Sequence, residues 1–213
     1  MKKFLLDNGC SNVYGEVLDC DVLGVDGSLD IIVELKTNLS FKLLDQVIER
    51  KHLGHYNYIA IPERKTPIPR CARELLLTHK IGLLEIIGEK DGYFDVYVSI
   101  PARYNRLANT SKQKGYGNIR KHIKDYNLAQ PGGVKSGEAV TDYSVTIKRI
   151  KHYLLYRKGG KWTTLDEILE HCETHYVNPK PSVAATLKAK WNENWCEIKV
   201  MNGIRYYRCK KED

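Results

Sequence analysis

The feature that most constrains the fold is the alternation of short apolar runs with amphipathic runs across residues 13–99. Six runs rich in branched apolar residues predict strands, at 13–17, 21–25, 29–36, 56–61, 81–87 and 93–99. Residues 41–53, after the candidate N-cap Ser40, and residues 71–80 have the apolar spacing of helices. This alternation favours an α/β sheet domain. Asp26-Gly27 predicts a tight turn, and therefore a hairpin between the second and third strands.

The charge is divided unevenly along the 213 residues. Residues 1–99 carry 12 Lys and Arg against 15 Asp and Glu, whereas residues 100–213 carry 22 against 11. A net charge of +11 in the second half predicts a polyanionic partner such as DNA. The densest basic stretch, residues 101–124, contains no acidic residue. It is interpreted as a phosphate-contacting segment, with a solvated linker as the alternative.

The C-terminal part has a different pattern, which begins after the turn-forming segment 130–137. Residues 141–157, 164–172 and 181–191 predict three helices, and residues 195–200 and 204–207 predict two strands joined by Asn202-Gly203. Three helices and a hairpin are typical of a winged helix. The predicted organisation is thus an α/β sheet domain at 1–100, a basic linker at 101–139 and a winged-helix-like domain at 140–213.

Six cysteines without a C-x-x-C pair predict reduced thiols in a cytoplasmic protein. The first ten residues lack the apolar stretch of a signal peptide, and no apolar run approaches the ~20 residues that cross a bilayer. No membrane partner is therefore expected. A homodimer is left open. His171, Cys172 and His175 are not expected to bind zinc, because only one cysteine lies there.

The strongest chemical signal is the run 31–36, in which Glu34 and Lys36 interrupt an apolar strand. Side chains two residues apart share one face of a strand, so the carboxylate and the ammonium point the same way. Burying charges costs several kcal/mol unless they are paired or bind a metal. Asp21 lies on the preceding strand of the predicted hairpin, where its carboxylate can approach Glu34. Two carboxylates, with the Leu35 carbonyl as a further oxygen, suit Mg²⁺ or Mn²⁺.

These residues resemble the PD-(D/E)XK nuclease superfamily, with Asp21 as its aspartate and Glu34-Leu35-Lys36 as its (D/E)-x-K. Residues 15–62 are similar to a bacterial and phage family of PD-(D/E)XK phosphodiesterases, and the similarity extends through Pro131-Gly-Gly and the C-terminal helices. The resemblance implies a restriction-endonuclease-like mixed sheet flanked by helices. Cys20 stands where the motif has proline, a position at which the superfamily often varies.

Further candidates are weaker. The resemblance implies that Glu16 is an extra acidic residue near the metal and that Gln46 faces the active site from its helix; the alternatives are an exposed carboxylate and a solvated glutamine. Asp19 replaces Asp21 if the strand register differs. Asp26 and Asp30 are interpreted as turn formers.

Charge and site together predict a metal-dependent DNA endonuclease. The alternatives are a DNA-binding regulatory protein with an inactive nuclease-like domain, and a nuclease that acts on RNA. In the C-terminal module, residues 182–191 are the predicted recognition helix, with Val183, Leu187 and Trp191 buried; contact with a protein is the alternative. The predicted nucleic-acid contacts are Arg103, Arg106, Lys112, Lys114, Arg120, Lys121, Lys124, Lys180, Ser182, Lys188 and Lys190.

Overall fold

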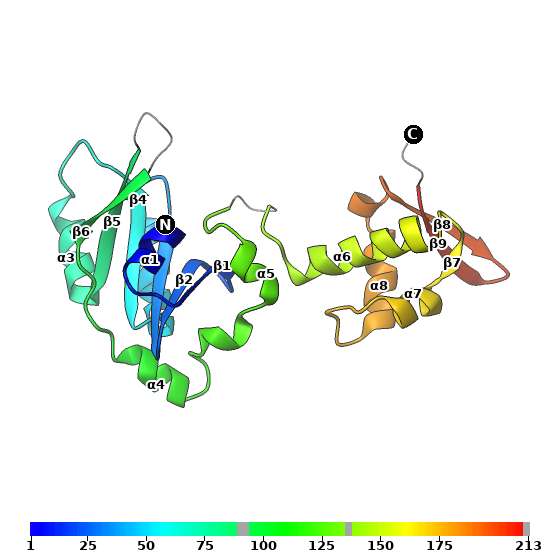
Figure 1. Ribbon diagram of the computed structural model, residues 1–213, viewed down its shortest axis with the longest axis horizontal. Helices are drawn as coiled ribbons and strands as arrows, with labels where there is room; N and C mark the ends of the chain where they lie inside the picture. Colours follow the sequence, from blue (N-terminus) through cyan, green and yellow to red (C-terminus); the bar gives the residue numbers. More distant parts are fainter. Residues whose placement is uncertain (89–93, 135–137, 211–213) are drawn as a thin grey trace. The chain divides into compact units, whose positions relative to one another are not determined.

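The computed structural model describes residues 1–88, 94–134 and 138–210. It divides into two compact units, Met1–Ala139 and Val140–Asp213, which are described separately (Figure 1). No helix in these described ranges is long and apolar enough to cross a membrane.

The first unit is built on a six-stranded mixed sheet in the order β1-β2-β3-β4-β5-β6. β3 pairs in parallel with β4, and β4 with β5, while the other neighbouring strands are antiparallel. The α/β class is therefore confirmed. The strands are β1 (Asn12–Val17), β2 (Cys20–Asp26), β3 (Leu29–Leu35), β4 (Tyr56–Pro62), β5 (Ile81–Gly88) and β6 (Phe94–Ile100).

The hairpin turns differ slightly from the prediction. β2 continues through Asp26, so the turn to β3 is Gly27-Ser28, with Gly27 at a φ of 52° that favours glycine. The predicted turn at 91–92 and the first residue of the predicted strand 93–99 lie outside the described residues.

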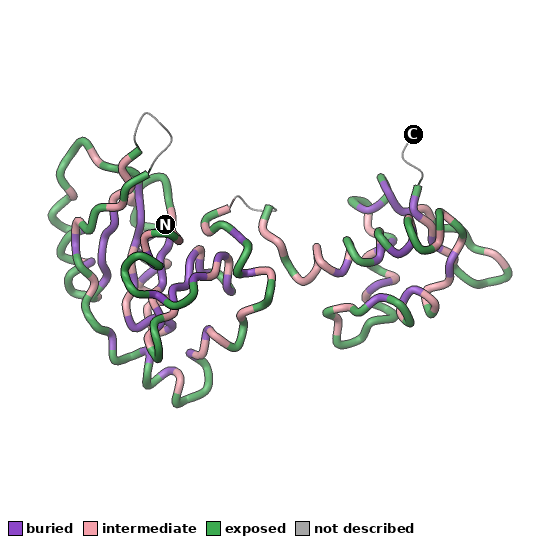
Figure 2. The backbone as a smooth tube through the Cα atoms, in the orientation of Figure 1, coloured by how far each residue is buried: buried purple, intermediate pink, exposed green. Residues whose placement is uncertain are grey.

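Helices pack on both faces of this sheet. α2 (Phe41–Arg50) begins at Ser40, whose hydroxyl accepts the Leu43 N–H as the predicted N-cap, and a 3-10 turn (Lys51–Leu53) follows it. α2 and α3 (Arg70–His79) share a buried cluster with β4 and β5, in which Ile59 and Ile61 take part. Ala60, between them in the chain, belongs to the cluster on the opposite face with Leu5 of α1 (Lys2–Asp7). The alternation of a strand thus separates the two layers, whose buried strands are visible in Figure 2.

The prediction of a separate basic linker at 101–139 is wrong, because this segment belongs to the first unit. It forms α4 (Leu107–Gln113), a 3-10 turn (Ile119–His122) and α5 (Asp125–Ala129). Ile119 is fully buried in a cluster with Ile32 of β3, and Asn127 donates to the carbonyls of Gly15 and Glu16 at 2.9 and 2.8 Å. The segment therefore covers strands β1 to β3.

The second unit combines three helices with a small antiparallel sheet in the order β7-β9-β8. Thr164 caps α7 as predicted, and Asn202-Gly203 joins the hairpin of β8 and β9. The two-residue strand β7, which completes the sheet, was not predicted. The elements are α6 (Asp142–His152), a π-helical turn (Tyr153–Arg157), β7 (Thr163–Thr164), α7 (Leu165–His171), α8 (Pro179–Lys188), a 3-10 turn (Lys190–Asn192), β8 (Cys196–Met201) and β9 (Ile204–Cys209).

Candidate active site

The candidate site lies where the β2–β3 ladder ends. The last pair in register is Val22 with Val33, and beyond it the Leu35 N–H donates to Asp21 Oδ2 at 2.6 Å instead of to the backbone of β2. The Asp21 carboxylate therefore takes the place of a backbone carbonyl of β2 as the acceptor of the Leu35 N–H. This bond holds Asp21 at the end of β3.

Glu34 and Lys36 meet Asp21 at this point. The Lys36 Nζ lies 3.1 Å from Asp21 Oδ2 and 3.7 Å from Glu34 Oε2. The Glu34 and Asp21 side chains are 2% and 14% exposed, while that of Lys36 is 40% exposed. The three residues that the sequence singled out thus lie together, with two shielded carboxylates and one ammonium that reaches solvent.

Arg50 is a fourth member that the sequence reasoning missed. Its Nη1 donates to Glu34 Oε1 at 3.1 Å and to the Asp19 carbonyl at 2.5 Å. Arg50 lies four residues after Gln46 on α2, and residues at this spacing share a helix face. A helix face that presents Gln46 to the site therefore presents Arg50 as well. Gln46 is half-buried, and its side chain forms no hydrogen bond among the described residues.

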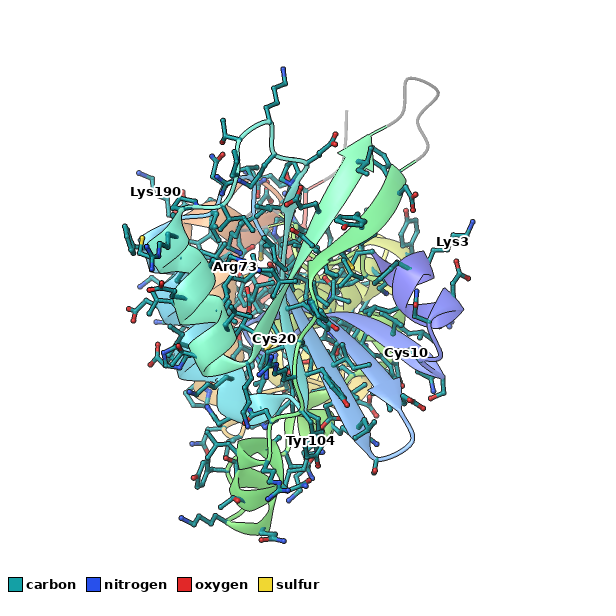
Figure 3. The ribbon with its side chains drawn as sticks, turned by 90° about the vertical axis from the view of Figure 1, so that its left-hand side faces the viewer. Lys3, Cys10, Cys20, Arg73, Tyr104 and Lys190 are labelled. Atoms are coloured by element: carbon teal, nitrogen blue, oxygen red, sulfur yellow. The ribbon has the colours of Figure 1, made fainter. Side chains whose placement is uncertain are left out.

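The surroundings of Glu34 shift its pKa. Burial, and then the neighbouring Asp21 carboxylate, raise the pKa of Glu34, while Arg50 and Lys36 oppose the shift. Cys20, labelled in Figure 3, is also buried, and burial together with Glu34 raises the pKa of its thiol to about 12. Cys20 is therefore a neutral packing residue at neutral pH.

The raised pKa of Glu34 has a measurable consequence for stability. An acid whose pKa is higher in the folded state favours folding while it is protonated, and this contribution is lost as pH rises through the folded-state pKa. In metal-free protein, Glu34→Gln is therefore expected to melt at nearly the wild-type temperature near pH 4, and at a higher temperature at pH 8. Melting curves in chelator across this range measure the difference. Glu49→Gln, an exposed change on α2, is the control; a constant difference, or one that falls with pH, contradicts the expectation.

The other acidic candidates do not join the pair. Glu16 has a φ of 56°, and its Oε1 accepts the Val134 N–H at 3.1 Å. It therefore fixes the loop at 132–134, although no contact with Asp21 is present among the described residues. Asp19 lies exposed in the turn between β1 and β2, and its backbone carbonyl accepts a hydrogen bond from Arg50. Of the two aspartates considered, Asp21 is the one beside Glu34.

The loop at 132–134 packs directly on the site. A Cβ on Gly132 would lie 2.5 Å from the Asp21 carbonyl oxygen, and one on Gly133 would lie 2.9 Å from the Leu35 Cβ. Only glycine allows this approach. The loop forms one wall of a cleft of about 360 Å³ that Asp21, Leu35 and Lys36 also line. Glu34 does not line the cleft, since its carboxylate bonds to Arg50 from α2.

The donor set can be tested against a divalent metal. Among the described residues no group of three or more His, Cys, Asp or Glu side chains could hold an ion. Two carboxylates do suit Mg²⁺, which retains several waters in protein sites. Both carboxylates already contact the Lys36 ammonium, and burial, followed by the Asp21 charge, raises the pKa of Glu34. Asp21 and Glu34 thus fit a hydrated cation, and no third His, Cys, Asp or Glu ligand accompanies them in the part of the chain that the structure describes.

Two of the predicted nucleic-acid contacts are occupied inside the first unit. Asp30, interpreted from sequence as a turn former, is fully buried on β3. Lys112 Nζ lies 2.5 Å from its Oδ2, and Arg120 Nε lies 2.5 Å from its Oδ1. Arg120 also donates to the carbonyls of Gly27 and Leu29, both at 2.8 Å. These contacts assign Lys112 and Arg120 to the structure of the unit.

A chain of polar contacts extends from Asp30. His55 Nδ1 accepts the Asp30 N–H at 2.9 Å, and His55 Nε2 lies 2.9 Å from Asn109 Oδ1. The Asn109 amide donates to the Tyr104 hydroxyl at 2.8 Å, and Figure 3 labels Tyr104 beside α4. Through its ion pairs with Lys112 and Arg120, Asp30 therefore connects α4 and the following 3-10 turn to the sheet. The predicted contacts that remain exposed in this segment are Arg103, Arg106, Lys114, Lys121 and Lys124.

The predicted recognition helix at 182–191 lies three residues earlier in the structure, as α8 (Pro179–Lys188). α8 ends at Lys188, because Ala189 is extended with a φ of −64° and a ψ of 139°. Val183 and Leu187 are buried as predicted. The prediction that Trp191 is buried is wrong, since its side chain is 71% exposed and donates to the Tyr143 hydroxyl.

The polar residues of α8 are only partly available. Lys180 forms an ion pair with Asp166 at 2.6 Å. Lys188 and Lys190 are exposed and Ser182 is half-buried.

Comparison with family models, with curated proteins and with solved structures finds no match to this chain.

Proposed function

We propose that this chain is a metal-dependent DNA endonuclease of the PD-(D/E)XK kind. The observation that carries the proposal is the meeting of Asp21, Glu34 and Lys36 at the end of β3, beside an open cleft. A mixed sheet with helices on both faces supports it. The net charge of +11 over residues 100–213 supports a nucleic-acid substrate.

In this proposal each residue has a distinct role. Asp21 and Glu34 would hold Mg²⁺ or Mn²⁺ with the Leu35 carbonyl. A cation held there would polarise a phosphodiester and lower the pKa of a bound water. Lys36, the most exposed of the three, orients the attacking water or stabilises the charge that develops on the phosphate. Arg50 positions the Glu34 carboxylate from α2.

The second unit is proposed to be a winged-helix-like DNA-binding module. Its element order, with α6, β7, α7 and α8 followed by the β8–β9 hairpin, supports this reading. α8 would then enter the major groove, with Lys188 and Lys190 near phosphates.

The test is cleavage of supercoiled plasmid, with single-stranded DNA and RNA of matched length as further substrates. Products that appear with Mg²⁺ or Mn²⁺ and are abolished by chelator support the endonuclease. Preferential cleavage of RNA would favour the RNA-directed alternative. No cleavage of any substrate with any divalent metal contradicts the enzyme.

One observation favours a second candidate, a DNA-binding regulatory protein with an inactive nuclease-like domain. Arg50 bonds to Glu34, and no third side-chain ligand accompanies the two carboxylates among the described residues. This protein would bind plasmid in a salt-dependent way without cutting it.

Lys36→Ala is expected to separate chemistry from binding. Turnover should fall by about 10²- to 10³-fold, because the ammonium acts on charge that develops in the transition state. The Kd for DNA should change by less than about threefold, since one exposed cation adds little to the electrostatic attraction. Single-turnover cleavage and fluorescence anisotropy measure the two effects. Lys42→Ala, an exposed change on α2, is the control; equal losses in affinity and turnover would make Lys36 an ordinary phosphate contact.

A further inference from the structure

The second unit contains a cationic cleft that α8 does not line. The cleft has a volume of about 620 Å³ and lies along α6, the π-helical turn and α7. Five of its lining residues are basic or imidazole side chains, and one is acidic. The five are Lys148, Arg149, His152, Arg157 and His171.

These cations are available to a ligand. Lys148 and Arg157 are exposed, and neither forms an ion pair within the described residues. Arg149 pairs with Glu173 at 3.3 Å, but the two side chains are 53% and 90% exposed. Such an exposed pair contributes little free energy, so the guanidinium can turn to another anion.

The backbone at this cleft is unusual. Tyr153–Arg157 forms a π-helical turn, a rare conformation that occurs frequently at functional sites. Tyr153, the first residue of this turn, is 7% exposed, and its hydroxyl has no hydrogen-bond partner within the described ranges. A buried hydroxyl without a partner costs free energy. The cleft therefore combines two exposed cations without an ion-pair partner among the described residues, Lys148 and Arg157, with a π-helical turn and a buried hydroxyl that has no hydrogen-bond partner there.

Aromatic rings accompany the charges. His171 stacks on Tyr153 with ring centres 5.1 Å apart, and its Nδ1 donates to the Glu167 carbonyl at 3.0 Å. Tyr156 is 70% exposed, with its ring centre 4.8 Å from that of His152. Cations that follow a groove beside an exposed aromatic ring are typical of proteins that bind single-stranded nucleic acid, where phosphates meet the cations and bases stack on the rings. An acidic peptide would use the cations but would leave Tyr156 without a role.

We propose that the α6–α7 cleft binds the phosphates of single-stranded nucleic acid, with Tyr156 as a stacking surface for an unpaired base. The inference rests on the proposed function in taking nucleic acid as the substrate, and adds a contact surface distinct from α8. The nuclease would thereby hold an unpaired segment, such as a flap, a gap or a displaced strand.

The test measures binding without cleavage, in the full chain carrying Asp21→Asn and in chelator. The probes are a fluorescent single-stranded DNA of about 15 nucleotides and the duplex of the same sequence. Arg149→Gln with Arg157→Gln is expected to weaken single-strand binding about tenfold or more, and to reduce the slope of log K against log salt by about 1.4 if two phosphate contacts are lost. Tyr156→Ala is expected to weaken it by roughly five- to a hundredfold, with little change for the duplex.

The control pair, Lys161→Gln with Lys199→Gln, removes the same charge from exposed positions of this unit and should leave single-strand affinity within about twofold. Single-strand binding by the arginine variant that equals the parent would overturn the proposal. So would displacement of the probe by orthophosphate or by a glutamate-rich peptide at the concentration at which unlabelled DNA displaces it. Because no hydrolysis is measured, this binding test can be interpreted even if the protein does not cleave DNA. Conversely, a cleft variant that binds normally would overturn the cleft proposal without affecting the cleavage test of the nuclease proposal.

Discussion

Replacing Glu34 by glutamine, or Asp21 by asparagine, is expected to lower Mg²⁺-dependent DNA cleavage by about 10³-fold or more. Each change removes one of two carboxylates proposed to hold the cation, and losing ~4 kcal/mol of transition-state stabilisation slows a reaction by this factor. The fold should persist. An asparagine at 21 keeps an oxygen that can accept the Leu35 N–H, and glutamine at 34 keeps the volume of a side chain that is 2% exposed.

Asp19→Asn is the matched control, because Asp19 lies two residues away with an exposed side chain, and its backbone carbonyl accepts the Arg50 hydrogen bond. Single-turnover cleavage of a labelled duplex measures the rates, and circular dichroism checks the fold. Wild-type rates in either site variant would contradict the assignment of Asp21 and Glu34 to the catalytic site. An equal loss in Asp19→Asn would point instead to a general electrostatic effect on DNA approach.

Much of the first unit was readable from sequence because its signals are local. Alternating apolar residues placed the strands, and the two-residue period put Glu34 and Lys36 on one face. The hairpin turn then brought Asp21 beside them, although the sequence did not reveal that its carboxylate replaces a strand partner of Leu35. Arg50 was within reach of the same reasoning, since Gln46 lies one helical turn before it.

The role of the basic segment 101–124 could not be predicted from local patterns. Seven cations without an acidic neighbour indicate a phosphate contact, yet Lys112 and Arg120 bind a carboxylate that lies 82 and 90 residues earlier in the chain. No local pattern encodes such a pair. The prediction that Trp191 is buried was wrong for a different reason. Its helical spacing from Val183 and Leu187 does not hold, because α8 ends at Lys188 and Ala189 is extended.

Arg120→Ala is expected to destabilise the first unit by about 3–5 kcal/mol, because it removes a partner from a fully buried carboxylate. Two further hydrogen bonds, to the carbonyls of Gly27 and Leu29, are lost with it. For a unit of this size the melting temperature should fall by roughly 10 °C. Lys121→Ala, the exposed neighbour in the chain, should leave it within about 2 °C.

The double variant Asp30→Asn with Arg120→Ala distinguishes a charge effect from lost packing. If the loss arises because the Asp30 carboxylate keeps only Lys112 as a close cation, neutralising Asp30 should restore part of the stability, so that the double variant is more stable than Arg120→Ala alone. Additive losses would show that Arg120 acts mainly through its contacts with the carbonyls. A melting temperature unchanged by Arg120→Ala, together with weaker DNA binding, would return Arg120 to the nucleic-acid surface, where its charge alone would place it.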